Sequence, residues 1–396
     1  MTRLIDDDER RARLGRRHLL ADGHRAETPA DVANALTAIH STDHTSTVLG
    51  VLARTSSLSI PDVERALYLD RSIVRVLGMR RTMFAVDYRL APAMWSSFDS
   101  TVARDQERLL VRYMHAAGID DPAGWIEESQ RRLLAFLADH PEATSAEIGE
   151  GDPYLSARLP ISGPGDTLTT QSVASRLLTL LSAKGIVLRG QPRGSWTSSQ
   201  VSWVETTQWR NDWPDRPGAD DGDLQIARSW LAGYAPATLE DLAWWTGWPK
   251  GRSRKALDRA GAIEVQTSAG PGFVLPDDVD PVESAGPWVA LLPGLDSSTM
   301  GWRNRAFYLG NHAKRVFDNV GNGGPTVWVD GRIVGGWAHR DSGEVAFEVF
   351  DDVGREALLA IETRADQLES ILKDAHQASR TALHRFRALT ALSSTA

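Results

Sequence analysis

Residues 35–54 of the chain read ALTAIHSTDHTSTVLGVLAR. A polar segment, residues 40–43, separates two stretches in which apolar residues recur at helical spacing. These apolar residues are Val32, Leu36 and Ile39 before the segment and Val48, Leu49 and Leu52 after it. Two amphipathic helices packed on a core would hold the segment rigidly while leaving its own side chains free.

The polar segment contains a base, a hydroxyl and a carboxylate, which are His40, Thr42 and Asp43. Such a set, presented by two packed helices, is a candidate catalytic centre. Thr42 or Asp43 is also a good N-cap for a helix that begins near Thr45, and His40 could end the preceding helix. The residues alone leave both interpretations open.

Length and composition set the broad class. A chain of 396 residues exceeds what one hydrophobic core usually serves, so we expect two to four domains. No apolar run approaches the roughly 20 residues of a membrane span, and the opening MTRLIDDDERRARLGRR has no apolar signal-peptide core. We therefore expect a cytoplasmic protein that does not bind membranes.

The chain contains no cysteine, which excludes disulfides, thiolate nucleophiles, iron–sulfur clusters and cysteine zinc sites. Its ten histidines form no HExxH or other close ligand pair. We expect neither a metal nor another cofactor.

The net charge of −8 is unevenly distributed. Residues 71–115 carry eight arginines against four acidic residues, and residues 153–213 carry six Lys/Arg against three acidic residues. Acidic runs lie elsewhere, at 6–9, 220–223, 277–280 and 351–352. The pattern fits one basic face with a solvated acidic back, and it fits scattered surface charge equally well.

Residues 1–95 have the outline of a winged helix, in which helices are followed by a pair of strands. Residues 79–86 alternate as a short strand, and Arg80 and Arg81 would lie on the wing side, where phosphates are usually contacted. Ordinary surface charge is the alternative for these two arginines. Residues 96–140 then read as a bridging pair of helices.

Residues 141–212 carry the best local signal for nucleic-acid binding. A helix over 171–184 stops at Gly185, and a strand, a basic glycine-rich loop and an aromatic strand follow. This is a second winged helix, although one used only for protein contact remains an alternative. Its candidate DNA-binding residues are Ser172, Ser175 and Arg176 on the helix and Arg189, Arg193 and Trp196 around the wing.

The winged-helix pattern of helices followed by a strand hairpin occurs a third time over residues 221–283, where Arg252 is a candidate phosphate contact. Residues 284–396 have a different sequence pattern from the preceding units. A polar loop contains Arg303, a hairpin around Asp330-Gly331 contains Arg332, and a long helix spans 353–373. The predicted fold is α+β, with three tandem winged-helix units, a C-terminal β-rich domain and a long C-terminal helix. Repeated winged helices suggest a concave monomer that embraces a duplex.

Six segments together resemble the winged-helix family of AlkZ/YcaQ-like DNA glycosylases. They are residues 35–54, LYLDRSIVRVLGMRRTMFAV at 67–86, RGQPRGSWTSSQVSW at 189–203, APATLEDLAWWTGW at 235–248, LLPGLDSSTMGWRNR at 291–305 and PTVWVDGRIVGGW at 325–337. The resemblance implies three tandem winged helices and binding of double-stranded DNA in the nucleoid. It also implies hydrolysis of the N-glycosidic bond of bulky alkylated purines, including interstrand crosslinks.

Glycosylases of this family carry Gln-x-Gln or Gln-x-Asp where this chain has His40-Ser41-Thr42 followed by Asp43. By position, His40 stands for the first glutamine and Thr42 for the second. In the resulting hypothesis, Asp43 stabilises the cationic sugar, while His40, titrating near neutrality, orients or deprotonates water with Thr42 as a second hydrogen-bond partner.

Two other classes of protein fit the same residues. A non-catalytic regulator or lesion sensor would use residues 40–43 only as a helix cap, and a regulator would prefer one operator without needing damage. A scaffold for another protein would show no salt-dependent affinity for DNA.

Overall fold

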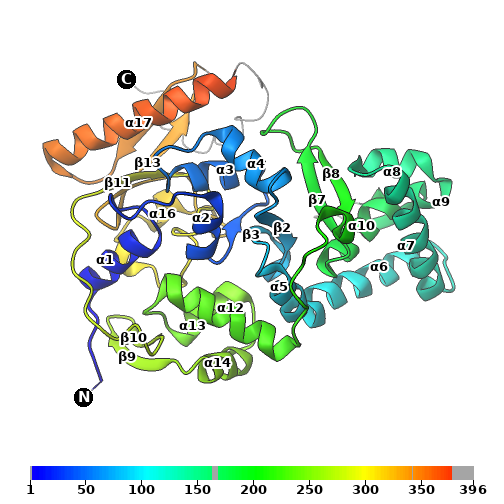
Figure 1. Ribbon diagram of the computed structural model, residues 1–396, viewed down its shortest axis with the longest axis horizontal. Helices are drawn as coiled ribbons and strands as arrows, with labels where there is room; N and C mark the ends of the chain where they lie inside the picture. Colours follow the sequence, from blue (N-terminus) through cyan, green and yellow to red (C-terminus); the bar gives the residue numbers. More distant parts are fainter. Residues whose placement is uncertain (1, 163–167, 341, 377–396) are drawn as a thin grey trace.

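The computed structural model describes residues 2–162, 168–340 and 342–376 (Figure 1). Residues 377–396, the end of the last predicted domain, lie outside the described residues. The chain combines helices with small antiparallel sheets, so the mixed helix-and-sheet class predicted from the sequence is confirmed.

The N-terminal part contains a three-stranded antiparallel sheet in the order β1-β3-β2. Its helices begin at strong caps: Thr28 and Asp31 form a capping box at α2, and Asp43 caps α3. Its elements are α1 (Asp7–Arg17), α2 (Pro29–Ala35), β1 (Ile39–His40), α3 (His44–Leu52), α4 (Ile60–Tyr68), β2 (Ile73–Leu77), a 3₁₀ turn (Met79–Arg81), β3 (Met83–Asp87) and α5 (Ala91–Phe98).

The next part, at the right of Figure 1, packs around its own apolar cluster, which joins α6, α7, α10 and β8. Its elements are a π-helical turn (Asp99–Ala103), α6 (Arg104–Ala116), α7 (Pro122–Asp139), β4 (Ala143–Thr144), α8 (Ser145–Gly151), α9 (Pro153–Ser156), β5 (Arg158–Ser162), β6 (Leu168–Ser172), α10 (Val173–Ala183), β7 (Val187–Pro192), β8 (Val201–Glu205) and α11 (Thr206–Trp209). The antiparallel pair β5–β6 lies where the sequence pattern indicated only a connection before the helix at 171–184.

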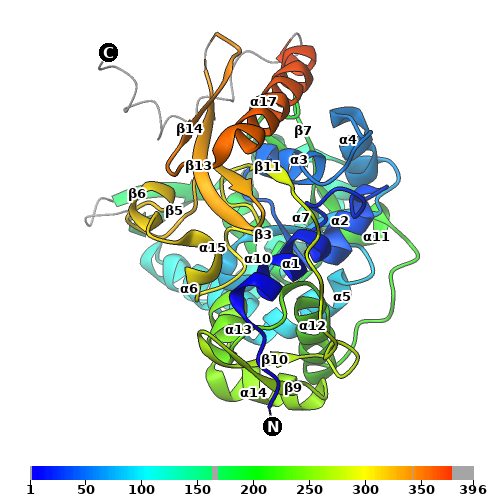
Figure 2. The same ribbon diagram turned by 90° about the vertical axis from the view of Figure 1, so that its left-hand side faces the viewer.

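The remaining chain forms a helical layer at the bottom of Figure 1 and a four-stranded sheet, β11-β12-β13-β14, which α17 packs against through β11 and β14 (Figure 2). The elements are α12 (Ala219–Tyr234), α13 (Leu239–Thr246), α14 (Lys250–Arg259), β9 (Ile263–Thr267), β10 (Gly270–Val274), β11 (Val289–Leu292), α15 (Ala306–Leu309), α16 (Ala313–Val316), β12 (Thr326–Val329), β13 (Arg332–His339), β14 (Val345–Val349) and α17 (Gly354–His376).

One large apolar core joins segments from both ends of the chain. It runs from Ile5 in the N-terminal segment through Trp230 of α12 and Trp328 of β12 to Leu372 of α17. The first and third predicted units therefore share one core with the C-terminal part, whereas most of the predicted 141–212 unit packs around its own cluster. Several tryptophans, including Trp209, Trp230, Trp328 and Trp337, are almost fully buried in this core, as expected for side chains with so much apolar surface.

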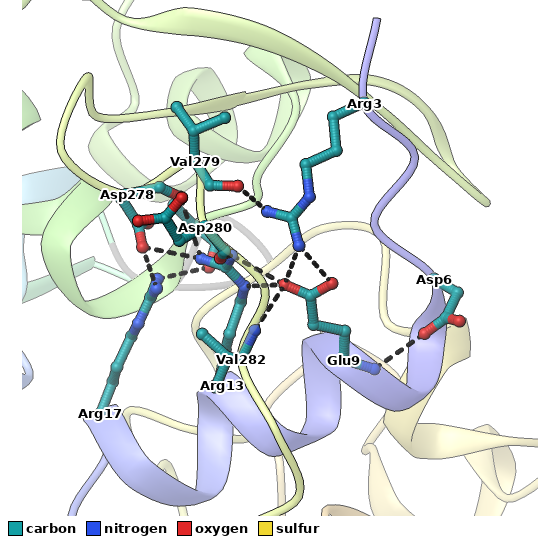
Figure 3. A network of polar contacts seen from close by, with 10 residues as sticks. Arg3, Asp6, Glu9, Arg13, Arg17, Asp278, Val279, Asp280 and Val282 are labelled. Atoms are coloured by element: carbon teal, nitrogen blue, oxygen red, sulfur yellow. Dashed lines mark hydrogen bonds and ion pairs between the residues drawn. The ribbon is translucent and has the colours of Figure 1, made fainter.

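A second link between distant segments is polar and lies at α1. Arg13 donates to Glu9 at 2.9 Å, to the Asp278 carboxylate at 2.7 Å and to the Asp280 carbonyl at 2.7 Å (Figure 3). Arg17 also pairs with Asp278. Because these arginines are neutralised inside the protein, the basic N-terminal helix does not present them to a polyanion, and the acidic run 277–280 is not simply solvated.

The most deeply buried ion pair joins Arg54, just after α3, to Asp296 in the loop after β11. Both guanidinium Nη atoms donate to the carboxylate, at 2.8 and 2.7 Å, and the two side chains are 0% and 2% exposed. Arg54 also donates to the carbonyls of His18 and Gly50 and to Ser298. The pair fixes the loop 293–305 against α3.

No helix in the described part of the chain is both long and apolar enough to cross a membrane.

We expect Asp296→Asn to lower the free energy of unfolding by about 3–5 kcal/mol, because it leaves the buried Arg54 charge uncompensated. Urea denaturation would measure the change. The matched control is Asp22→Asn, whose carboxylate is 70% exposed beside Arg25 and Arg364. The control should cost less than about 1 kcal/mol, and an equal cost for both substitutions would contradict this assignment.

Candidate active site

A cavity of about 330 Å³ opens where the N-terminal sheet, α13 and the loops after β11 and α16 meet. His40 lies in its wall at the end of β1, opposite a strongly basic and aromatic lining. The lining residues are His40, Arg80, Thr82, Trp244, Leu295, Met300, Arg303, Arg305, Val320, Gly321 and Asn322. None of them is acidic.

The backbone around His40 is held from several sides. His40 pairs with Phe84 in the β1–β3 ladder, and its carbonyl accepts a hydrogen bond from the Thr47 hydroxyl at 3.2 Å. Ser297 donates to the Ala38 carbonyl at 2.9 Å, which joins β1 to the loop that Asp296 anchors. The sequence pattern extended the helix to residue 39, whereas α2 ends at Ala35 and the chain becomes extended. His40 therefore ends a strand and not a helix.

The imidazole of His40 packs edge-on against Phe84, with 5.7 Å between ring centroids. Its Nδ1 is buried and has no hydrogen-bond partner among the described residues. Burial lowers the pKa of His40 to about 4, and the positive charge of Arg80 adds to this effect, while Asp296 opposes it. At neutral pH the ring is uncharged, so the expectation that it titrates near neutrality is wrong.

The rest of the polar segment lies outside the cavity lining. Ser41 is buried, and its carbonyl and hydroxyl accept hydrogen bonds from Arg75 at 2.8 and 2.9 Å. Thr42 is exposed. Asp43 accepts a hydrogen bond from the Thr45 N–H at 3.1 Å as the N-cap of α3. The structure thus gives Asp43 the geometry of the capping interpretation and brings only His40 to the cavity.

The basic side of the cavity is built from two segments far apart in sequence. Arg80 has a φ of 53° in the tight turn between β2 and β3 and is exposed, as is the neighbouring Arg81. The guanidinium carbons of Arg80 and Arg305 lie over the ring of Trp244, at 4.5 and 4.9 Å from its centroid. Arg80 and Arg303, both predicted to bind DNA, therefore line one cavity with His40.

A buried carboxylate positions the arginine loop. Asp241, which is 0% exposed, accepts hydrogen bonds from the backbone N–H groups of Arg303 and Asn304 at 2.9 and 2.8 Å. Its other oxygen accepts from the backbone and hydroxyl of Thr238 in a capping box. The N-terminus of α13 and the loop 303–305 are thereby tied together.

The candidates of the 141–212 unit do not form a free basic face. Trp196 is only 6% exposed and belongs to the core, so it cannot stack on a base. Arg176 lies over Tyr113, and Arg189 lies over Trp203 with its pKa lowered by burial to about 10. The others are placed as follows: Ser172 caps α10, Ser175 is half-buried, and Arg193 is exposed and bonds to the Glu142 carbonyl and the Glu147 carboxylate.

Two further candidates lie elsewhere. Arg252 is held by Asp223 at 2.6 Å and by Ser97, so its charge is already paired inside the protein. Arg332 is exposed at the start of β13 and lines a different cavity, beside Trp288. The structure brings neither of them to His40.

Sequence reasoning missed Trp244 and Arg305 as parts of the site. Arg305 was visible in the polar loop 296–305, but the sequence carried no signal that this loop meets Trp244 of α13. In the described part of the chain, no three His, Cys, Asp or Glu side chains gather in a way that could hold a metal ion.

Comparison with known proteins bears directly on this site. The model of the family described as DNA glycosylase AlkZ-like matches residues 33–371. The chain belongs to the AlkZ-like DNA glycosylase family. The resemblance seen in the six sequence segments is confirmed, and the family match includes every residue of the cavity lining.

The curated relative and the structural neighbour of this AlkZ-like chain both come from Streptomyces sahachiroi. An interstrand DNA cross-link repair glycosylase is 26% identical over 199 residues, which is 48% of this chain and 52% of the relative. The match thus spans about half the length of that curated relative. The solved structure of the DNA glycosylase AlkZ has a TM-score of 0.72 at 21% identity, covering 92% of this chain and 96% of that one. The structural likeness establishes a shared fold.

We expect Arg80→Gln to raise the pKa of His40 above about 4, because the substitution removes a nearby like charge. NMR titration of the imidazole C–H resonances would measure the pKa. Arg81→Gln, which removes an exposed arginine outside the cavity lining, is the matched control and should leave the value unchanged. An identical pKa in both variants would show that Arg80 does not act on His40.

Proposed function

We propose that this protein binds double-stranded DNA through tandem winged-helix units and hydrolyses the N-glycosidic bond of a bulky alkylated purine, with His40 as the central catalytic group. The observation that carries the proposal is the placement of a neutral, partnerless imidazole in an arginine-lined cavity of an AlkZ-like chain. The cross-link repair activity named for the Streptomyces sahachiroi relative supports a bulky substrate.

The winged-helix part of the proposal rests on the order of elements. Three of the antiparallel strand pairs that follow helices, β2–β3, β7–β8 and β9–β10, lie at the ends of the inferred units. We infer units at 1–95, 141–212 and 221–283, with 96–140 as bridging helices and 284–396 as the β-rich C-terminal domain. The turn between β2 and β3 carries Arg80 and Arg81, as a wing that meets phosphates would.

The chemistry that we propose suits a neutral histidine. When the bond between C1′ and the purine nitrogen breaks, its electron pair stays with the purine. This pair cancels the positive charge of the alkylated base. Little acid catalysis is then needed. The sugar passes through an oxocarbenium-like state, and water adds to C1′. The uncharged imidazole of His40 can orient this water and accept its proton as the new C–O bond forms.

A non-catalytic DNA-binding protein is the second candidate, and two observations favour it. Asp43 acts as a helix cap, and the cavity lining contains no carboxylate that would stabilise a cationic sugar. Under this alternative the protein would bind duplex DNA and release no base.

We expect His40→Ala to slow the release of alkylated purine from duplex DNA by roughly 10²–10⁴-fold, the usual contribution of a positioned acid–base group. Abasic sites formed in single-turnover reactions would measure the rate. Affinity for undamaged duplex, measured in parallel, should stay within a few-fold of wild type. Wild-type protein that releases no base from alkylated duplex would favour the non-catalytic alternative instead.

Asp43→Ser separates capping from catalysis, because serine retains an oxygen for the Thr45 N–H and removes the carboxylate. We expect this variant to keep base release near the wild-type rate. Asp43→Ala should lose roughly 1 kcal/mol of stability through the missing cap. If Asp43→Ser loses as much activity as His40→Ala, the carboxylate is part of the reaction centre.

A further inference from the structure

The cavity beside His40 is lined by three arginines that form no ion pair among the described residues. Among the described residues, no carboxylate lies within 4 Å of the guanidinium groups of Arg80, Arg303 or Arg305, and the cavity lining is free of acidic side chains. Some buried arginines elsewhere have such partners, as Arg54 has Asp296 and Arg13 has Asp278, whereas the buried Arg75 bonds to Ser41 instead. The arginines of the cavity therefore differ from those that the fold pairs internally.

Two of the three arginines are also directed to the same aromatic ring, while Arg303 lines the same cavity. Arg80 and Arg305 both approach the Trp244 ring within 5 Å of its centroid, at 4.5 and 4.9 Å. Arg305 further donates from Nε to the Trp302 carbonyl at 2.9 Å. Although Arg80 is exposed as a residue, partial desolvation of its guanidinium group lowers its pKa, and the charge of Arg305 lowers it further. Two like charges held around one ring would be stabilised by an anion that contacts both.

Guanidinium groups recognise phosphate well, because their planar N–H donors match its oxygens and remain charged. The proposed reaction itself calls for such an anion. Three uncompensated positive charges would repel a cationic alkylpurine and the oxocarbenium-like sugar, and a bound phosphate would remove much of this repulsion.

We propose that Arg80, Arg303 and Arg305 form a phosphodiester-binding site that is filled by one backbone phosphate of the DNA whose damaged nucleotide faces His40. This proposal rests on the proposed function, since it takes DNA as the ligand. Trp244 serves as the rigid support that sets the position of the Arg80 and Arg305 guanidinium groups. The phosphate fixes the register of the strand, and its negative charge offsets the positive charge of the three arginines.

The salt dependence of binding to a short undamaged duplex tests the proposal without requiring catalysis. Fluorescence anisotropy between about 50 and 200 mM salt gives the slope of log K against log salt, whose magnitude is about 0.9 for each phosphate that the protein neutralises. We expect this magnitude to be smaller by about 0.9 in the triple variant Arg80→Gln, Arg303→Gln, Arg305→Gln. Arg228→Gln, which removes an exposed arginine on α12 outside the cavity lining, is the control and should leave the slope unchanged.

A second measurement uses the wild-type protein, so it does not depend on the folding of the variant. Neutral methylphosphonate linkages are placed one at a time along a duplex that carries one non-hydrolysable analogue of an alkylated nucleotide, which fixes the register, and we expect one position to reproduce the reduction of about 0.9 in slope. If no position does so, or if the folded triple variant keeps the wild-type slope, the site does not bind a DNA phosphate. A reduction about three times as large in the triple variant would mean that each arginine binds its own phosphate, which would overturn the single site.

These measurements distinguish a failure of the phosphate-site proposal from a failure of the proposed function. Absence of any DNA binding by the wild-type protein would contradict the proposed function and the phosphate site together. Normal base release with an unchanged slope in the triple variant would contradict only the phosphate site. A reduced slope in a protein that releases no base would support the phosphate site and contradict only the glycosylase activity.

Discussion

The bidentate pair between Arg54 and Asp296 is the interaction on which the site depends. It joins the end of α3 to a loop more than 240 positions later in the sequence, and both side chains are almost fully buried. This loop carries Met300, Arg303 and Arg305 into the cavity wall, while α3 follows the segment that carries His40. A buried ion pair adds little net stability compared with apolar packing, but separating its partners would leave buried charges uncompensated. Here the pair brings the arginine loop to the imidazole.

The resulting site combines the uncharged imidazole of His40 with a cavity wall that is rich in arginine. Burial, reinforced by Arg80, lowers the pKa of His40 to about 4, so the ring does not add a fourth positive charge at neutral pH. The same charges make the cavity by itself unfavourable for a cationic sugar and favourable for a phosphate. DNA would thus supply both the reacting nucleotide and the anion that makes the site compatible with its chemistry. This dependence distinguishes the arrangement from one in which a protein carboxylate, such as Asp43, provides the negative charge.

Local signals in the sequence predicted local structure well. The cap at Asp43, the hairpin at Asp330-Gly331 and the long C-terminal helix all appear close to the expected positions, in α3, β12–β13 and α17. The site was predicted only in part, because its geometry depends on contacts between distant segments. The charge of an arginine in a sequence does not reveal its partner: Arg252 forms an ion pair with Asp223, whereas Arg80 and Arg303 line the cavity with no ion pair to any described residue. Trp196, predicted to bind DNA, is buried by packing that no local pattern encodes.

The central claim is that duplex DNA enters the cavity and reaches His40. The most direct test follows the imidazole resonances of His40 during titration with a duplex that carries a non-hydrolysable analogue of an alkylated nucleotide. The account predicts that these resonances shift on binding and that the pKa of His40 rises above about 4, because a phosphate beside Arg80 offsets the like charge. Resonances and a pKa that stay unchanged at saturating DNA would contradict the claim.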